Sequence, residues 1–383
     1  MKIAYLCDIS PLEAWSYSSG NARIYTALEQ QGAQVDIITN SWGPLELLRK
    51  TIHQLPTSIN WRTRWRLHLL LSRLVSGTVT KALRNDHYDV LFCPYSFQSL
   101  ANLKLPYPML KVFSSDATPT AYKRSEIGAE FGSFLLISRL LDPAILQAET
   151  KVFQANDLNI WPSEWQKNQA DKIYKLDDEK SVVIPWGANI ADPGKDNRSC
   201  HPPTAQNVQL LLVGRDWFAK GGPLAFETLQ TLRNGGVNAH LTVIGCTPPD
   251  FHRSDAMTVY PSLDKNNKSE LAKFETEYKR AHFFVMPSYE SFGFAFCEAS
   301  AYGLPSIALR IGGVPILEGI NGHTLPSDAT ALDIANCIRY YLDKPAKYTA
   351  LSASSRGYYE STLNWGAWGK TVIDLFESKI SDQ

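Results

Sequence analysis

Three features are scarce in this sequence: paired cysteines, net charge and long apolar runs. No two of the six cysteines form a Cys-x-x-Cys pair, so neither a zinc site nor a disulfide framework is predicted. The 38 lysines and arginines balance 38 aspartates and glutamates, so net charge creates no global field that would attract nucleic acid or a membrane. No run of about 18 apolar residues occurs, which excludes a membrane-spanning helix.

The cysteine pattern, the start of the sequence and the chain length predict the cellular compartment and the number of domains. Most of the cysteines lie in or beside apolar runs, as buried free thiols do, so we expect a reducing compartment and a cytoplasmic protein. The sequence begins MKIAYLCDIS, whose apolar portion is too short for a signal peptide and indicates a first strand. The 383 residues exceed the usual size of one hydrophobic core, which predicts two domains.

Apolar runs and helical patterns alternate along most of the chain. A predicted strand over Lys2–Cys7, a helix over Ala22–Gln31 and a strand over Val35–Thr39 open a doubly wound α/β domain. A second alternation begins with the predicted strand Val208–Val213. Residues 191–206 between them are rich in aspartate, proline, glycine, asparagine and serine, which is typical of a linker.

These patterns predict an N-terminal Rossmann-like domain over residues 1–190 and a C-terminal Rossmann-like domain over residues 191–362, with a cleft between them. No short-period repeat or low-complexity tract is present. The fold class is therefore α/β.

One basic stretch, Trp61–Arg84, stands out against the balanced charge. Its tryptophans, its leucines and its arginines are typical of a helix that lies on an anionic membrane surface. More often, such a helix packs its leucines on the domain's sheet and leaves its arginines in water. The first interpretation predicts a cytoplasmic protein that is peripheral on the inner face of the membrane, and both interpretations stay open.

Two positions of the first half follow predicted strands. Gly20 ends a loop longer than such connections usually need, and it opens a helix at the point where backbone N–H groups face a ligand. Asp116 follows the predicted strand Met109–Phe113, at the sheet edge where α/β proteins bind ligands. The alternatives are an ordinary helix cap at Gly20 and a turn acid before Pro119 at Asp116.

Two acids lie in a strand–loop–helix–strand unit of the second half. The predicted strand Phe283–Met286 leads to Glu290 in the loop, and the helix that begins at Phe294 carries Glu298. Acids on either side of the N–H groups at a helix start suit a ligand with sugars on either side of a phosphate. The alternative is a pair of solvated acids stabilised by the helix dipole.

A glycine-rich basic loop, GRDWFAKGG at residues 214–222, follows the strand Val208–Val213. It places Arg215 and Lys220 among glycines before a helix start, which suits a diphosphate. These cations could neutralise a nucleoside diphosphate leaving group without a metal. Neither the Walker spacing nor the Gly-x-Gly-x-x-Gly fingerprint is present, and solvated loop cations are the alternative.

Three motifs, taken in order, resemble the retaining nucleotide-sugar glycosyltransferases of family four, which have the GT-B fold. They are Gly214-Arg215 with Lys220-Gly221-Gly222, Glu290-x-Phe292-Gly293 through Glu298-Ala299, and Gly312-Gly313-Val314-Pro315 with Asn321-Gly322. The resemblance is carried by residues 207–326 and thins over the amino-terminal half, where Ser19-Gly20 stands in place of the paired glycines of many members. It implies two Rossmann-like domains facing a cleft, and a C-terminal helix over residues 363–383 that returns to the N-terminal domain.

The resemblance implies a role for each acid of the second half. Glu298 would hold the ribose hydroxyls of a nucleotide-sugar donor, and Glu290 would hold the hydroxyls of the donor's sugar. The backbone between them would meet the phosphates or the sugar, through Ser291, Phe292, Gly293 and Phe294.

The resemblance likewise assigns the cations and the residues of the first half. Arg215 and Lys220 match the family's diphosphate clamp, and Gly20 would approach the donor phosphate from the N-terminal domain. Asp116 falls near the place where members carry a His or Asp beside the reacting sugar. We therefore expect Asp116, Glu290 and Lys220 at the reacting centre.

On this basis we expect a hexosyltransferase of the kind used in polysaccharide biosynthesis. It would move a hexose from a nucleotide diphosphate sugar to a hydroxyl of a glycan, a lipid-linked glycan or a small molecule, with the anomeric configuration retained. The expected mechanism is same-face displacement, with no metal, no cofactor and no nucleic-acid partner. The alternatives are a catalytically inactive sugar-nucleotide-binding protein and a GT-B phosphorylase or epimerase.

Overall fold

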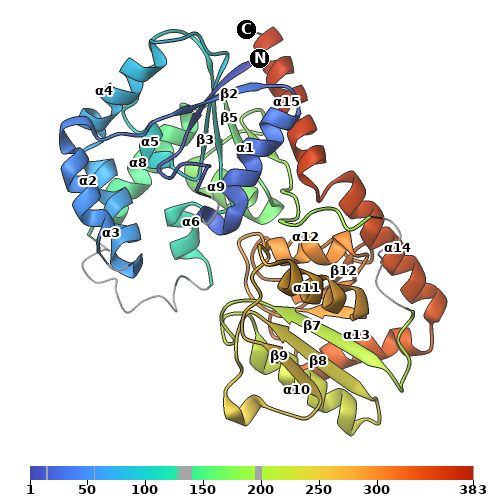
Figure 1. Cartoon of the computed structure of the whole chain (residues 1–383). Coiled ribbons are helices and arrows are strands. Elements are labelled where there is room, and N and C mark those ends of the chain that lie inside the picture. The colour runs from blue at the N-terminus through green and yellow to red at the C-terminus, as the bar shows by residue number, and fades with distance from the viewer. Residues whose placement is uncertain (14–15, 56, 127, 129–139, 195–200, 383) are drawn as a thin grey trace. The chain divides into compact units, whose positions relative to one another are not determined.

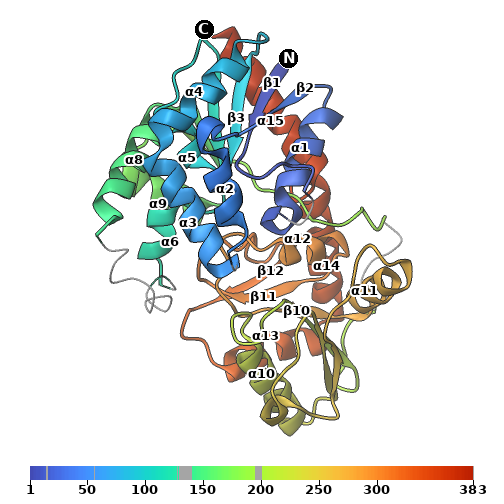
Figure 2. The same cartoon turned by 60° about the vertical axis from the view of Figure 1, so that its left-hand side comes forward.

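A computed structural model describes residues 1–13, 16–55, 57–126, 128, 140–194 and 201–382 of the chain, with residues 57–62 as backbone alone. The chain divides into two compact units. Unit 1 is Met1–Pro185 with Trp368–Gln383, and unit 2 is Trp186–Ala367. In both units helices pack against a parallel sheet (Figures 1 and 2).

The sheet of unit 1 has the strand order β2-β1-β3-β4-β5-β6, and every adjacent pair is parallel. Its strands are β1 (Lys2–Leu6), β2 (Gln34–Ile38), β3 (Val90–Pro94), β4 (Leu110–Ser114), β5 (Leu158–Trp161) and β6 (Ser181–Val183). Its helices are α1 (Gly20–Gln30), α2 (Glu46–His53), α3 (Thr57–Leu70), α4 (Ser72–Leu83), α5 (Phe97–Leu100), α6 (Pro119–Arg124), α8 (Asp142–Gln154) and α9 (Glu164–Tyr174).

The sheet of unit 2 has the order β12-β11-β10-β7-β8-β9 and is also parallel throughout. Its strands are β7 (Val208–Val213), β8 (Ala239–Ile244), β9 (Met257–Tyr260), β10 (Phe283–Val285), β11 (Ser306–Leu309) and β12 (Gly322–Leu325). Its helices are α10 (Gly222–Asn234), α11 (Lys268–Arg280), α12 (Phe294–Ala301), α13 (Ala331–Leu342) and α14 (Pro345–Ser361). Two doubly wound sheets confirm the predicted α/β fold class.

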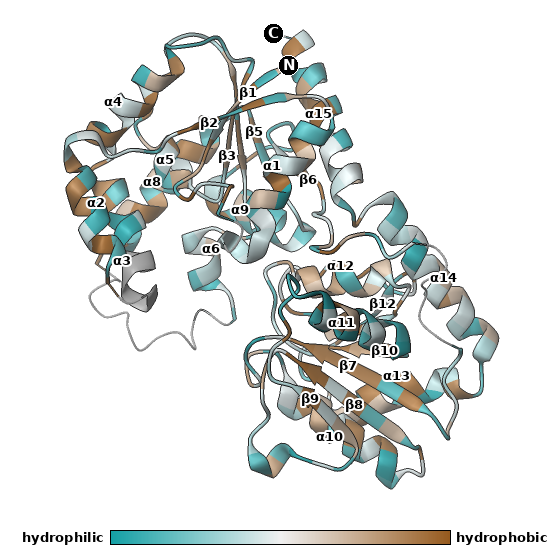
Figure 3. Ribbon diagram, in the orientation of Figure 1, coloured by the Kyte–Doolittle hydropathy of each residue, from teal (hydrophilic) through white to brown (hydrophobic). Residues whose placement is uncertain are grey.

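Apolar sequence explains why these segments form central strands. All five residues of β3 and all three of β10 are buried, because helices cover both faces of a parallel sheet. In Figure 3 the strands β7 and β8 carry brown, hydrophobic segments along much of their length. The two cores are thus organised around their sheets.

The C-terminal helix α15 (Trp365–Ser381) returns to the first sheet, as predicted. Its Trp368 and Phe376 lie against Phe92 of β3, with ring centroids 6.4 and 6.0 Å apart. Trp368 is 1% exposed and Phe376 is fully buried. The helix therefore completes the core of unit 1.

The basic stretch is not one helix. α3 ends at Leu70, and α4 begins at Ser72, after Leu71. The prediction that the arginines of this stretch are solvated is wrong for Arg64, which is buried in an ion pair with Asp8. No helix of the described part of the chain is long and apolar enough to cross a membrane. Contact with a membrane surface stays a prediction, and the side chain of Trp61 lies outside the described residues.

Candidate functional site

Strand order brings two loops of unit 2 together at one edge of its sheet. β7 lies beside β10, although β8 and β9 come between them in the chain, so the winding of the sheet reverses here. In open α/β sheets such a switch point, at the carboxyl ends of the strands, is where ligands bind. The loop after β7 carries Arg215 and Lys220, and the loop after β10 carries Glu290.

Lys220 and Glu290 form an ion pair across this switch point. The Nζ of Lys220 lies 2.5 Å from Oε1 of Glu290, and the hydroxyl of Ser288 donates to the same oxygen at 3.0 Å. The side chains are only 28% and 14% exposed, so the pair is shielded from solvent on most sides. Two residues predicted separately, 70 positions apart, therefore meet at one point. Arg215, in contrast, is exposed.

Two glycines make room for this pair. A Cβ on Gly214 would stand 2.3 Å from Cγ of Lys220. The Lys220 side chain can therefore pack against residue 214 only because glycine has no side chain. Gly312 has a left-handed backbone with φ of 72°, and a Cβ there would stand 2.3 Å from the carbonyl oxygen of Glu290. That carbonyl accepts a hydrogen bond from the N–H of Gly313 at 2.8 Å. Gly312 and Gly313 thus allow their backbone to approach the loop of Glu290 closely.

Glu298 is held by two residues that the sequence did not single out. It lies on α12 and is 4% exposed, and it accepts hydrogen bonds from Lys265 Nζ at 2.8 Å and from the Tyr278 hydroxyl at 3.2 Å. Burial, reinforced by the Glu298 charge, raises the pKa of Tyr278 well above its usual range, so this phenol stays a donor. Neither partner belongs to a recognisable motif, which is why sequence reasoning missed them.

Aromatic side chains fix the turn that starts α12. Gly293 is left-handed, with φ of 87°, and it caps the helix. The ring of Trp186 stacks on Phe294, with centroids 5.7 Å apart, and meets Phe292 edge-on at 5.6 Å. Phe292 is buried. The residues predicted at this turn, Ser291 among them, are therefore placed at a packed helix start beside Glu290.

The predicted residues of unit 1 lie at the carboxyl edge of its own sheet. Gly20 is the first residue of α1 and is buried, and Asp116 lies two residues after β4 and is partly buried. They belong to the other unit from Lys220 and Glu290. Their roles stay predictions.

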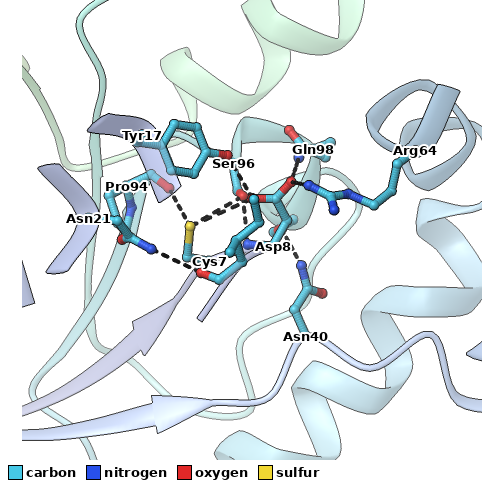
Figure 4. A network of polar contacts seen from close by, with 11 residues as sticks. Cys7, Asp8, Tyr17, Asn21, Asn40, Arg64, Pro94, Ser96 and Gln98 are labelled. Atoms are coloured by element: carbon cyan, nitrogen blue, oxygen red, sulfur yellow. Dashed lines mark hydrogen bonds and ion pairs between the residues drawn. The ribbon is translucent and has the colours of Figure 1, made fainter. Parts of the chain in front are cut away.

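A buried network surrounds Asp8 at this edge, where Tyr17, Gln98 and Arg64 point toward its carboxylate (Figure 4). Arg64 Nη2 lies 3.2 Å from Oδ2, the Tyr17 hydroxyl donates to Oδ1 at 2.8 Å, and Gln98 Nε2 lies 3.4 Å from Oδ2. The Asp8 and Arg64 side chains are 8% and 6% exposed. The network anchors the loop before α1, because Tyr17 belongs to that loop.

The same loop adopts an unusual backbone. Tyr17, Ser18 and Ser19 all have positive φ, at 51°, 54° and 70°, a conformation that costs L-residues roughly 1–2 kcal/mol each. Tyr95 is also left-handed, and its ring stacks on Tyr17 with centroids 3.9 Å apart. Ser19 therefore takes up a left-handed conformation that glycine adopts at lower cost, and the network offsets part of that cost.

Side chains that could hold a metal ion do not gather in the described part of the chain. Within those ranges no group of three or more His, Cys, Asp or Glu side chains is arranged to hold a metal. The charged groups of the site in unit 2 include the two lysine–glutamate pairs and the exposed Arg215. This arrangement suits an anionic ligand that also carries hydroxyl groups.

Comparison with protein families accounts for both units. A model described as Glycosyltransferase Family 4 matches residues 21–192, and a model described as Glycosyl transferases group 1 matches residues 207–344. The first model lies over most of unit 1, and the second covers the sheet and the site of unit 2. Both agree with the predicted resemblance.

Two curated relatives share one description. A D-inositol 3-phosphate glycosyltransferase of Kineococcus radiotolerans is 26% identical over 262 residues, which is 61% of this chain and 60% of that protein. Another, from Actinosynnema mirum, is 24% identical over 96% of this chain and 93% of its own length. For the Kineococcus relative and that of Corynebacterium kroppenstedtii, the match spans 60% and 50% of the relative's length.

Solved structures share the fold over the whole chain. Sucrose-phosphate synthase from Thermosynechococcus elongatus aligns with a TM-score of 0.67 at 19% identity and covers 100% of both chains. Anabaena Alr3699/HepE in complex with UDP and glucose aligns with a TM-score of 0.61 at 13% identity, over 99% of this chain and 100% of that one. These likenesses confirm the GT-B fold class.

Proposed function

Because the chain belongs to the glycosyltransferases of family 4 and group 1, we propose that it transfers a hexose from a nucleotide diphosphate sugar to an acceptor hydroxyl and retains the anomeric configuration. The Lys220–Glu290 pair at the switch point of unit 2 is the observation that carries this proposal. It sets a cation beside an acid, and a carboxylate can accept hydrogen bonds from sugar hydroxyls, at the edge where α/β sheets bind ligands.

Donor binding would redistribute the partners of this pair. Lys220 would turn from Glu290 to the diphosphate, whose charge it neutralises as the glycosidic bond breaks. Glu290 would then accept hydrogen bonds from hydroxyls of the donor's sugar. Arg215, exposed in the same loop, would add a second cation, so the proposal requires no metal.

The other end of the donor would lie at Glu298. A carboxylate accepts hydrogen bonds from two vicinal hydroxyls, such as those of a ribose. Lys265 and Tyr278 hold this carboxylate in place before the donor arrives, which reduces the ordering cost of binding. Backbone N–H groups at the start of α12 would face the phosphates or the sugar.

The transfer step would be a same-face displacement. The acceptor oxygen forms a bond to the anomeric carbon, the bond to the diphosphate oxygen breaks, and the departing diphosphate takes the acceptor's proton. The lysine and arginine stabilise the charge that develops on this leaving group. We place Gly20 and Asp116 with the acceptor-binding unit as candidates for the same step.

The names of the relatives suggest the first acceptors to test. Curated relatives are described as acting on D-inositol 3-phosphate, and one solved neighbour is a sucrose-phosphate synthase. Phosphorylated cyclitols and sugars therefore precede glycans and lipid-linked glycans in an acceptor screen.

The test begins with thermal unfolding in the presence of UDP-, GDP- and ADP-sugars, because a ligand that binds the folded state raises Tm. The stabilising donor is then incubated with each acceptor, and release of nucleotide is measured. Glu290→Ala and Lys220→Ala should each lower kcat by about 100-fold or more with the fold intact, while Lys273→Ala, an exposed lysine on α11, should not. Donor binding without transfer to any acceptor, or near-normal turnover in either site variant, would contradict the proposal.

A further inference from the structure

A cavity of about 410 Å³ that is open to solvent beside the exposed Leu70, Arg73 and Lys151 lies in unit 1, between α3, α5 and α8. Its volume is in the range of small-molecule sites, roughly 300–1,000 Å³. Most of its wall is apolar and comes from helices, including Leu69, Leu70, Leu100, Leu141, Ile145 and Val152. Its lining residues on α8 run from Ala144 to Val152.

Positive charge is concentrated in this cavity. Arg66, Arg73, Lys111 and Lys151 line it, and no aspartate or glutamate is among its lining residues in the described part of the chain. Two of the four cations come from the basic stretch identified in the sequence. The proposed transfer of a sugar does not use them.

Among these four cations, Lys111 gives the clearest indication of an anionic ligand. It lies on β4 and is 8% exposed, and burial lowers the pKa of its ammonium, while Asp157 opposes that effect. Asp157 also accepts a hydrogen bond from the backbone N–H of Lys111 at 2.7 Å. A cation in an apolar environment is costly unless an anion neutralises it.

The cavity is distinct from the carboxyl edge of the sheet. Lys111 is the second residue of β4, whereas Asp116 follows the last residue of that strand. The part of the cavity beside Lys111 therefore lies toward the opposite edge from Asp8 and Asp116. Its contents need not compete with the substrates of the transferase.

We propose that this cavity binds an anionic single-chain lipid, with the charged headgroup on the cations and the chain along the apolar wall of α8. Charge complementarity selects an anion, because four cations and no acid line the cavity. The apolar wall selects a chain rather than a sugar phosphate, because only Asn102 and Gln147 among the uncharged lining residues carry polar side chains. Because no carboxylate among the described residues lines the cavity, the hydroxyls of a sugar would find few acceptors there.

Calorimetry on the full chain tests this proposal with lysophosphatidic acid, lysophosphatidylcholine of the same chain length and inorganic phosphate, each below its aggregation concentration. We expect saturable binding of one lysophosphatidic acid per chain, at least tenfold tighter than either of the other two. The zwitterionic lipid tests the need for net charge, and phosphate tests the need for the chain. Equal binding of lysophosphatidylcholine, or equally tight binding of phosphate alone, would overturn the proposal.

A matched pair of variants locates the site. Lys111→Met keeps most of the side-chain volume and removes a desolvated charge, so the fold should persist, and lysophosphatidic acid should bind at least tenfold more weakly. Lys104→Met removes an exposed lysine nearby and should leave Kd unchanged. Ala148→Trp, which fills the cavity from α8, should abolish lipid binding while the donor's thermal shift persists. Wild-type Kd in both Lys111→Met and Ala148→Trp would refute the assignment.

Discussion

Lys265 Nζ lies 2.8 Å from Oε1 of Glu298, a carboxylate that is 4% exposed. The lysine itself is 39% exposed in its side chain and extends over the ring of Phe274, 4.4 Å from its centroid. A flexible, partly solvated cation thus neutralises a buried acid. A second pair, between Lys220 and the less deeply buried Glu290, gives the site of unit 2 two lysine–glutamate pairs.

Removing one partner of a buried ion pair leaves an uncompensated charge. Lys265→Ala should therefore lower the free energy of unfolding by about 1–3 kcal/mol, less than for a fully buried pair because the lysine is partly solvated. Urea titration of the two proteins measures the difference. Lys268→Ala, an exposed lysine three positions away, is the control and should change little. Wild-type stability in Lys265→Ala would show that Tyr278 alone suffices to hold Glu298.

Apolar runs in the sequence located the strands well, because central parallel strands are buried on both faces. The predicted strand Val208–Val213 coincides with β7, and the predicted strands Lys2–Cys7 and Phe283–Met286 each extend one residue past β1 and β10. β12 was not predicted: only Gly322 of its four residues is buried, so no apolar run marks it. Its pairing with β11 forms it instead.

Motifs located Lys220, Glu290 and Glu298, but not what each of them touches. Lys265 and Glu298 are 33 positions apart, and Arg64 and Asp8 are 56 apart. No spacing rule links residues on different elements. The break between α3 and α4 could not be predicted either, because Leu71 continues the leucine run of the basic stretch.

Two glycines with the same backbone conformation allow the effect of left-handed strain to be measured apart from the effect of steric crowding at the site. Gly312 and Gly319 have φ of 72° and 71°, but a Cβ on Gly312 meets the Glu290 carbonyl, whereas a Cβ on Gly319 meets nothing within 4 Å. Both alanine variants should lose about 1–2 kcal/mol of stability from the left-handed conformation. Gly312→Ala alone should also displace Glu290 and lower kcat/KM for transfer by about tenfold or more. Equal kinetics in the two variants would show that the approach of Gly312 to Glu290 is not required.

The turn before α1 offers a stabilising substitution. Ser19 has φ of 70° and makes no side-chain capping hydrogen bond, so glycine should occupy this position at lower cost. Ser19→Gly should raise the free energy of unfolding by about 1 kcal/mol. Ser125→Gly, at φ of −70°, should lower it instead, because glycine there adds freedom to the unfolded chain and the hydrogen bond from the Ser125 hydroxyl to the Tyr122 carbonyl is lost. Destabilisation by both substitutions would show that the left-handed turn is not under strain.

Glu149 should make unit 1 less stable as the pH rises. This fully buried acid accepts a hydrogen bond from the N–H of Thr120 at 3.1 Å, and burial raises its pKa from 4.5 to about 7. The folded state therefore favours the protonated form, and stability falls by about 2–3 kcal/mol between pH 5 and pH 8. Glu149→Gln, a neutral side chain of similar shape, should flatten this fall in urea titrations. An unchanged slope would mean that the carboxylate is ionised in the fold at little cost.

His68, in contrast to Glu149, should make the protein less stable as the pH falls. It lies on α3, 3% exposed, with its ring 5.6 Å from that of Trp42. Burial lowers its pKa from 6.5 to about 4, and Arg64 adds to this effect while Asp8 opposes it. The folded state thus favours the neutral imidazole, so its full contribution is present above pH 6.5 and is lost as the pH falls toward 4. Between pH 7.5 and pH 5 the loss should be about 2 kcal/mol.

The change in the free energy of unfolding with pH, rather than its value at one pH, tests whether His68 stays neutral in the folded state. His68→Gln removes a titrating group but also changes packing, so its stability at a single pH does not separate the two effects. Its free energy of unfolding should vary less between pH 7.5 and pH 5 than that of the wild type, by the same 2 kcal/mol or so. His53→Gln, at an exposed histidine on α2, should keep the wild-type slope. If His68→Gln kept that slope too, the imidazole would have to be protonated within the fold, and the buried Asp8–Arg64 network would be carrying one more positive charge than its contacts suggest.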